Sequence, residues 1–304
     1  MSIKIKLIFS SIFLFLIVAS LWWGVTTIRE KLLERKTRNE AIQNNKIEEA
    51  TITTIEGWTM EDVAEYLESE KIVTSKDFFA AAKNIVLTDY PYLATLPANA
   101  SLEGYLFPDT YRVAKGAPAS GVLEKMLDNF ASRLKTAAAN FTDYKSRYLV
   151  PGYGSIILDE ENKGLTLHEL VTLASIVERE TGSAAGQQTG EQLLEERKTV
   201  AGIFYNRLSI GQALQSDATL NYITQSGRAQ ANEQDLQLNS PYNTYKFRGL
   251  TPGPIGNPSL SSLIAVFHPE KTDYFYFLHS QTTGQVYYAR NFDEHTQNKA
   301  KYLR

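Results

Sequence analysis

The sequence predicts an α+β protein, in which an N-terminal transmembrane helix precedes a small unit and a larger mixed α+β domain. Three observations lead to this fold class. An uncharged run fills residues 7–28, strand-like and helical stretches follow it without regular alternation, and the connections are long and marked by proline and glycine. A parallel doubly wound sheet needs regular alternation of strands and helices, so an α+β layout fits better.

The composition excludes several classes of protein. The chain has 304 residues, 31 Lys and Arg against 34 Asp and Glu, and no cysteine. A net charge of -3 leaves no basic excess for a phosphate backbone, so we expect no nucleic-acid binding. The absence of cysteine excludes a disulfide scaffold, a thiolate zinc site and a cysteine nucleophile. A globular enzyme with ordinary side chains or a binding module remains.

Residues 7–28 predict a single-pass anchor in the lipid bilayer. As a helix they span about 33 Å, enough for the hydrocarbon core. A cleaved signal peptide is the alternative, but the run is too long and no small-residue cleavage site follows it. We therefore expect residues 1–6 in the cytoplasm. The charge rule alone does not settle this orientation, because the basic residues after the run outnumber Lys4 and Lys6 before it.

Two further segments precede the larger domain. Residues 29–48 are densely charged and contain no glycine or proline, which predicts a solvated helical stalk. Residues 49–100 predict a strand and two short helices, the first beginning at Thr59 with Asp62 and the second at Ser75. A unit this small buries little core alone, so we expect it to pack on its neighbour.

The larger domain, residues 101–304, combines both kinds of element. The predicted helices span 121–136, 167–181, 192–208 and 261–267, and the predicted strands span 110–114, 274–279 and 285–289. No internal repeat is present.

The helix at 167–181 carries an acid on its apolar face. Thr166 and Glu169 have the spacing of a capping box, which fixes the register. In that register Glu178 falls within the apolar stripe, whereas Glu180 falls on the flank near Glu169. A carboxyl group on a buried stripe is costly to ionise, which suits a general acid. The alternatives are a structural ion pair with an arginine, or a frayed helix end that lets Glu178 reach solvent.

Four loops are rich in groups that bind polar ligands. They are LEGYLFPDTY at 102–111, LQSD at 214–217, SPYNTY at 240–245 and GLTPGPIGNP at 249–258. Amide, hydroxyl and aromatic groups on such loops suit a carbohydrate, although each loop alone is also ordinary turn chemistry. The candidate sugar-binding residues are Glu103, Tyr105, Gln215, Ser216, Asp217, Ser240, Tyr242, Asn243, Tyr245 and Asn257.

No pattern in the sequence indicates a metal or a cofactor. The four histidines lack metal-ligand spacing, and His168 with Glu169 lacks the second histidine of a zincin motif. Neither a phosphate-binding glycine loop nor a nucleophile elbow is present.

Six motifs in order resemble the MltG/YceG-like endolytic murein transglycosylase family: LEGYLFPDTY, ASIVERET, VAGIFYNRL, LQSD, SPYNTY and GLTPGPIGNP. The resemblance covers nearly the whole chain. It implies a bacterial inner-membrane protein with an extracytoplasmic, periplasmic bulk, a LysM-like subdomain at 49–100 and a catalytic domain at 101–304. It departs from the family pattern at Thr251, which replaces a usual proline, and at 182–197, which is longer than usual.

The resemblance also implies an activity and its essential acid. Glu178 would cleave the MurNAc–GlcNAc bond within nascent peptidoglycan strands, first as acid and then as base, and leave a 1,6-anhydroMurNAc end. The family also implies a role in ending strand elongation and cooperation with peptidoglycan synthases. Two alternatives stay open: a hydrolytic muramidase with Asp217 or Glu103 as second carboxylate, and a non-catalytic, membrane-anchored glycan-binding scaffold.

Overall fold

The computed structural model describes residues 29, 48–139, 148–150, 154–156, 165–181, 188–226, 231–280 and 282–303. The chain divides into two compact units, Met1–Glu49 and Ala50–Arg304, and the second contains nearly all of the described residues. The predicted anchor at 7–28 and most of the predicted stalk lie outside the described residues. No helix in the described ranges is both long and apolar enough to cross a membrane.

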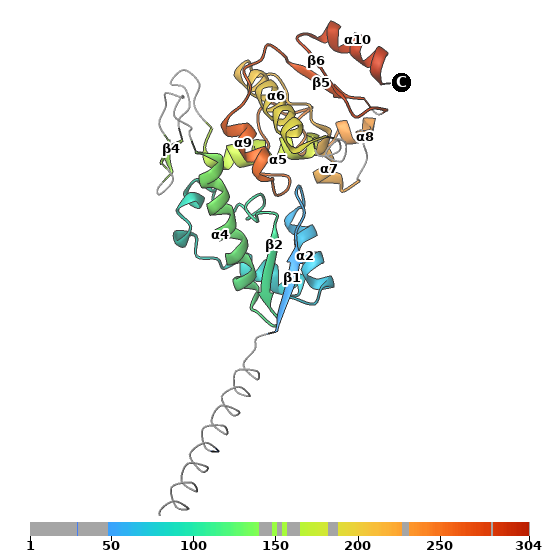
Figure 1. The fold of residues 1–304 in the computed structure, drawn as a ribbon. Coiled ribbons are helices and arrows are strands. Elements are labelled where there is room, and N and C mark those ends of the chain that lie inside the picture. Colours follow the sequence, from blue (N-terminus) through green and yellow to red (C-terminus); the bar gives the residue numbers. More distant parts are fainter. Residues whose placement is uncertain are drawn as a thin grey trace, which may run out of the picture. The chain divides into compact units, whose positions relative to one another are not determined.

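The first half of the larger unit is built on one strand pair. Its elements are β1 (Glu49–Thr53), α2 (Met60–Ser69), α3 (Ser75–Lys83), the 3-10 helices η1 (Leu87–Asp89) and η2 (Pro91–Thr95), β2 (Thr110–Ala114) and α4 (Ala119–Ala137). β1 pairs with β2, so the strand pair joins segments on both sides of residue 100 (Figure 1). The predicted domain division at residue 100 stays a prediction.

The second half is mainly helical. Its elements are β3 (Tyr148–Val150), β4 (Gly154–Ile156), α5 (Leu167–Thr181), α6 (Gly190–Ser209), α7 (Asp217–Thr224), α8 (Glu233–Leu236), α9 (Leu260–Phe267), β5 (Tyr276–His279), β6 (Val286–Ala289) and α10 (Phe292–Tyr302). The pairs β3–β4 and β5–β6 are antiparallel. Within the described ranges every sheet has two strands, which confirms the mixed α+β prediction.

Helix ends follow the capping chemistry in the sequence. Thr59 and Asp62 form the predicted capping box of α2. The cap of α3 is Thr74, one residue before the predicted Ser75, because the Thr74 hydroxyl accepts from the amide of Asp77. At α5 the amide of Thr166 donates to the Glu169 carboxylate over 2.6 Å, as the capping box predicts.

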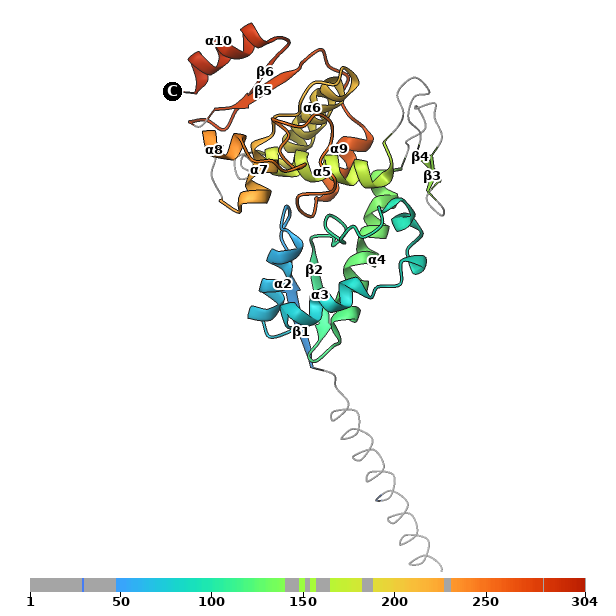
Figure 2. The same ribbon diagram turned by 180° about the vertical axis from the view of Figure 1, so that it is seen from behind.

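Helix α5 is the central element of the larger unit. It packs against α6 and α9, and Figures 1 and 2 show it between these helices and the half of the fold that contains β1, β2 and α4. The apolar stripe formed by Leu170, Val171, Ala174 and Val177 is fully buried. The C-terminal turn of α5 therefore lies where both halves of the fold meet.

The loop at 249–258 ties the two halves together through Asn257. The Oδ1 atom of Asn257 accepts from the amide of Leu106 over 3.0 Å, and its Nδ2 atom donates to the carbonyl oxygen of Trp58 over 2.9 Å. The Gly57 amide also donates to the Asn257 carbonyl over 2.8 Å. Gly57 also contacts the end of α5, because its carbonyl oxygen accepts from the Arg179 side chain over 3.2 Å.

Close packing of α6 requires a glycine at position 202. A Cβ atom there would lie 2.1 Å from the carbonyl oxygen of Glu270, which is backbone and cannot rotate away. We expect Gly202→Ala to lower the free energy of unfolding by about 1–3 kcal/mol in urea denaturation. Gly190→Ala on the same helix is the control, because no atom lies within 4 Å of its added Cβ. Equal stability of both variants would contradict this packing.

Candidate active site

Glu178 lies in a buried ion pair. Its side chain is only 4% exposed, and its Oε1 atom is 2.5 Å from the Nη2 atom of Arg197 on α6. Its Oε2 atom accepts from the Ser259 amide over 2.9 Å and from the Ser259 hydroxyl over 2.5 Å. Both oxygens of Glu178 are therefore occupied by hydrogen-bond donors of the protein. The predicted burial of Glu178 is confirmed, and the arginine partner matches the structural alternative.

Arg197 makes the ion pair part of a larger network. The guanidinium is 2% exposed and donates to the Thr181 hydroxyl over 3.1 Å and to the Ser259 hydroxyl over 2.8 Å. It also donates to the Ser261 hydroxyl. The network fixes the C-terminal turn of α5 to α6 and to the start of α9. A buried arginine of this kind needs all of these acceptors.

Glu180, two residues further on, faces the loops that carry the polar motifs. Its side chain is partly buried, and it accepts from the Ser216 hydroxyl of LQSD. Burial raises the pKa of the Glu180 carboxyl. The bonds from Ser216 and from the Ala218 amide oppose that rise, and the negative charge of Asp217 adds to it. Glu180 thus combines partial exposure with a pKa that burial raises, which is the direction that a general acid needs.

Two motif residues stand beside Glu180 as a hydrogen-bonded pair. The Tyr245 hydroxyl of SPYNTY donates to the Asp217 carboxylate over 2.7 Å. Burial, and then the bond to Asp217, raises the pKa of the Tyr245 hydroxyl, so it stays a donor. The carboxylate of Asp217 therefore lies at the start of α7, next to the Ser216 hydroxyl that binds Glu180.

A buried cation also faces this site. Arg207 on α6 donates to the carbonyl oxygens of Phe275 and Leu214, and its charge interacts with that of Glu180. These contacts connect the VAGIFYNRL helix with the loop before α7. The cluster of Glu180, Ser216, Asp217, Tyr245 and Arg207 thus brings together four of the six sequence motifs.

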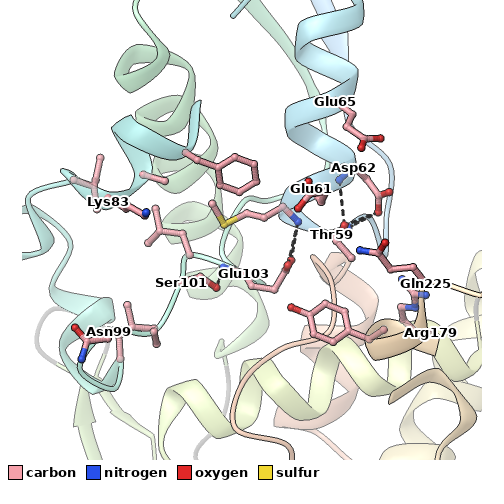
Figure 3. A pocket seen from close by; sticks show the side chains of 18 of the residues that line it. Thr59, Glu61, Asp62, Glu65, Lys83, Asn99, Ser101, Glu103, Arg179 and Gln225 are labelled. Carbon is pink, nitrogen blue, oxygen red and sulfur yellow. Dashed lines mark hydrogen bonds between the residues drawn. The ribbon is translucent and has the colours of Figure 1, made fainter. Parts of the chain in front are cut away.

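Glu103 lies in a second cluster, at a large pocket. Both of its carboxylate oxygens accept from the Met60 amide, over 3.0 and 3.1 Å, at the start of α2. Burial raises its pKa to about 7, although the Met60 amide bond opposes the rise. The rings of Tyr222 and Tyr242 lie 5.2 Å apart, and the charge of Glu103 acts on both hydroxyls. Figure 3 shows Glu103 between α2 and Arg179 in the pocket wall.

The proton on Glu103 makes stability depend on pH. The pKa of Glu103 is about 7 in the folded protein, whereas the ordinary pKa of a glutamate is 4.5. Between these pH values the folded state therefore binds more protons than the unfolded state. Stability from this group therefore falls as pH rises from about 4.5 to about 7. The glutamine of Glu103→Gln is neutral at every pH. The variant should therefore lack up to about 3 kcal/mol of this decrease in the free energy of unfolding. Urea denaturation of both proteins at acidic and alkaline pH checks this, and an identical pH dependence would contradict it.

Three predicted sugar-binding residues are fully occupied within the protein. The Tyr105 hydroxyl is buried and lies 3.0 Å from the Nδ1 atom of His168, which fixes the start of α5. The Asn243 amide donates to the carbonyls of Leu236 and Leu238 over 3.0 and 2.9 Å. Asn257 makes the bonds described above. We interpret all three as residues that shape the loops, because their polar atoms already have partners.

The other two candidates lie at loop surfaces. The Ser240 hydroxyl accepts from the Tyr242 amide over 3.3 Å, within its own turn. Gln215 is exposed and has a φ of 49°, a left-handed conformation that turns the chain into Ser216. Gln215 therefore stands at the edge of the Glu180 cluster, whereas Ser240 does not join it.

The described part of the chain contains no group of three or more His, Asp or Glu side chains that could hold a metal ion.

The chain belongs to the YceG-like family, because a sequence model of that family matches residues 25–301. Two curated relatives are named endolytic murein transglycosylase. The one from Streptococcus pneumoniae is 33% identical over 277 residues, which cover 84% of this chain and 45% of that protein. The one from Bacillus subtilis is 36% identical over 202 residues, which cover 66% of this chain and 48% of that protein. The chain thus matches about half the length of these relatives.

The fold also resembles a solved structure. The crystal structure of a YceG-like protein from Listeria monocytogenes superposes with a TM-score of 0.65 at 27% identity, covering 82% of this chain and 75% of that one. Similarity at this level agrees with membership of the family.

Proposed function

We propose that this protein is an endolytic lytic transglycosylase that cleaves the MurNAc–GlcNAc bond within peptidoglycan strands. The observation that carries the proposal is the position of the Glu180 carboxyl, whose pKa is raised by burial. It accepts from Ser216 of LQSD, next to Asp217, which in turn accepts from Tyr245 of SPYNTY. Membership of the YceG-like family and the names of the relatives support the same activity. Digestion of purified strands, with the masses of the products measured, tests it.

The proposed reaction needs one carboxyl group and no water. Glu180 donates its proton to the oxygen that links MurNAc to GlcNAc, and the bond from that oxygen to C1 of MurNAc breaks. The Glu180 carboxylate then takes the proton of the C6 hydroxyl, whose oxygen bonds to C1 and closes the 1,6-anhydro ring. Glu180 ends protonated, as it began. One residue thus serves as acid and as base.

The neighbours of Glu180 have distinct proposed roles. Ser216 orients the carboxyl through its hydroxyl. Asp217, held by Tyr245, supplies negative charge beside the oxocarbenium-like transition state. Arg207 orders the loop before α7 through its bonds to backbone carbonyls.

The contacts favour Glu180 over Glu178 as the acid. The family resemblance assigns that role to Glu178, which stays a candidate. Both oxygens of Glu178, however, are held by Arg197 and Ser259 in a site from which solvent is excluded. A proton donor must reach the substrate, and Glu180 is partly exposed, accepts from the Ser216 hydroxyl and has a pKa that burial raises. We therefore propose that Glu178 positions the end of α5 for Glu180.

Hydrolysis by the same site is the second candidate, because Asp217 lies close enough to influence Glu180 and could activate a water. Hydrolysis with Glu103 as the second carboxylate has less support, because Glu103 lies at the pocket beside Met60 and not in the Glu180 cluster. Product masses separate the two reactions, since an anhydro end is lighter than a reducing end by one water. Strands that are bound but left intact would instead support the scaffold reading.

We further propose that residues 7–28 anchor the protein in the plasma membrane and that the catalytic domain is extracytoplasmic. The uncharged run supports the anchor, and a peptidoglycan substrate supports the location. A LysM-like role for 49–100, cooperation with peptidoglycan synthases and a role in ending strand elongation rest on the family resemblance. Protease treatment of intact protoplasts tests the orientation: the domain should be degraded, and its protection would contradict the proposal.

A further inference from the structure

The pocket that contains Glu103 has a volume of about 1050 Å3. Its wall is formed by α2, α3, the segment at 96–103, Arg179 of α5 and the α7 residues Asn221 and Tyr222. Arg179 precedes Glu180 in the chain, and the cap of α7 is Ser216, which binds Glu180. The pocket therefore shares two helices, α5 and α7, with the proposed active site.

The pocket offers an apolar floor and free charges on two sides. The floor is formed by Phe79, Ala82, Ile85, Leu87, Leu96 and Leu102. Glu61 and Glu65 of α2 are exposed in its wall, and within the described part of the chain neither makes an ion pair. Figure 3 shows Lys83 and Asn99 on the side opposite to Glu61 and Glu65.

These features fit a short peptide with a basic side chain. Glu61 and Glu65 are one helical turn apart, so both carboxylates can approach one ammonium group. Lys83 and the Asn99 amide can bind peptide carboxylate and carbonyl oxygens. The apolar floor can cover small side chains such as alanine. A glycan chain without peptides carries no ammonium group and would leave the α2 carboxylates unpaired.

We propose that this pocket binds a stem peptide of the strand whose glycan bond lies at Glu180, with its side-chain ammonium group at Glu61 and Glu65. This inference rests on the proposed function. It makes the enzyme selective for strands that still carry amine-bearing peptides.

The test uses the full chain and two substrates: strands with their stem peptides, and strands from which an amidase has removed them. We expect the wild type to have the lower KM on peptide-bearing strands. In the double variant Glu61→Gln with Glu65→Gln, that preference should fall about fivefold. Acetylating the peptide amines should lower the wild-type preference to the same extent. The control variant, Glu70→Gln with Glu124→Gln, removes two exposed carboxylates outside the pocket and should keep the preference.

The outcomes distinguish the inference from the proposed function. If the wild type cleaves both substrates with equal KM, or the Glu61 and Glu65 variant keeps the full preference, the peptide site is wrong and the activity stands. An equal change in KM on both substrates also overturns the peptide site. If the wild type cleaves neither substrate, the proposed function itself fails.

Discussion

Replacing Glu180 with glutamine is expected to lower kcat on peptidoglycan strands by at least about a thousandfold. Glutamine has nearly the same shape and still accepts the hydrogen bond from the Ser216 hydroxyl, but it can neither donate nor take the reacting proton. The free energy of unfolding should change little. The measurement is kcat from product release on purified strands, together with urea denaturation of the same protein.

Glu178→Gln is the matched comparison, because it makes the same chemical change two residues away. We expect it to lower the free energy of unfolding, because the ion pair with Arg197 is lost. Activity should fall only indirectly, through displacement of the C-terminal turn of α5 that carries Glu180. A stable Glu178→Gln protein without activity, beside an active Glu180→Gln protein, would return the role of acid to Glu178.

Replacing Arg197 with alanine is expected to lower the free energy of unfolding by about 3–5 kcal/mol. The change leaves the Glu178 carboxylate buried without its cation, and it removes the donor to Thr181, Ser259 and Ser261. Arg179→Ala is the control and should lower the free energy of unfolding less. Its bond to the Gly57 carbonyl, at 3.2 Å, is only part-buried and leaves no charged partner behind. Urea denaturation measures both.

A second variant separates the lost pair from lost packing. Replacing Arg197 with methionine and Glu178 with leucine removes both charges while keeping much of the volume, so it should cost less than Arg197→Ala alone. If Arg197→Ala unfolds no more easily than the wild type, the ion pair does not hold α5 in place.

The sequence predicted α5 accurately because local rules determine it. The capping box at Thr166 and Glu169 set the register, and the apolar stripe then identified Glu178 as buried. The same projection placed Glu180 on a flank, and nothing in the sequence favoured it as the acid in place of Glu178. The proposed role of Glu180 depends on the contact with Ser216 and the charge of Asp217, which lie far along the chain and come close only in the fold.

Side-chain type alone could not separate binding residues from structural ones. Asn243 and Asn257 have amides that suit a sugar, yet both are saturated by backbone groups of the protein. Helix α10 was not predicted, because none of its residues is buried and its sequence lacks an apolar stripe. The Glu103 pocket also depends on tertiary contacts between segments near residues 60, 80, 100 and 222, which no local pattern encodes.

The proposed reaction uses one carboxyl group and no water. Digestion of purified strands by the full chain in water enriched in heavy oxygen tests this, with the masses of the new glycan ends read by mass spectrometry. We predict 1,6-anhydro ends that carry no heavy oxygen, formed by the wild type and absent with Glu180→Gln. New reducing ends that carry heavy oxygen would show that water attacks the bond, and would contradict the account.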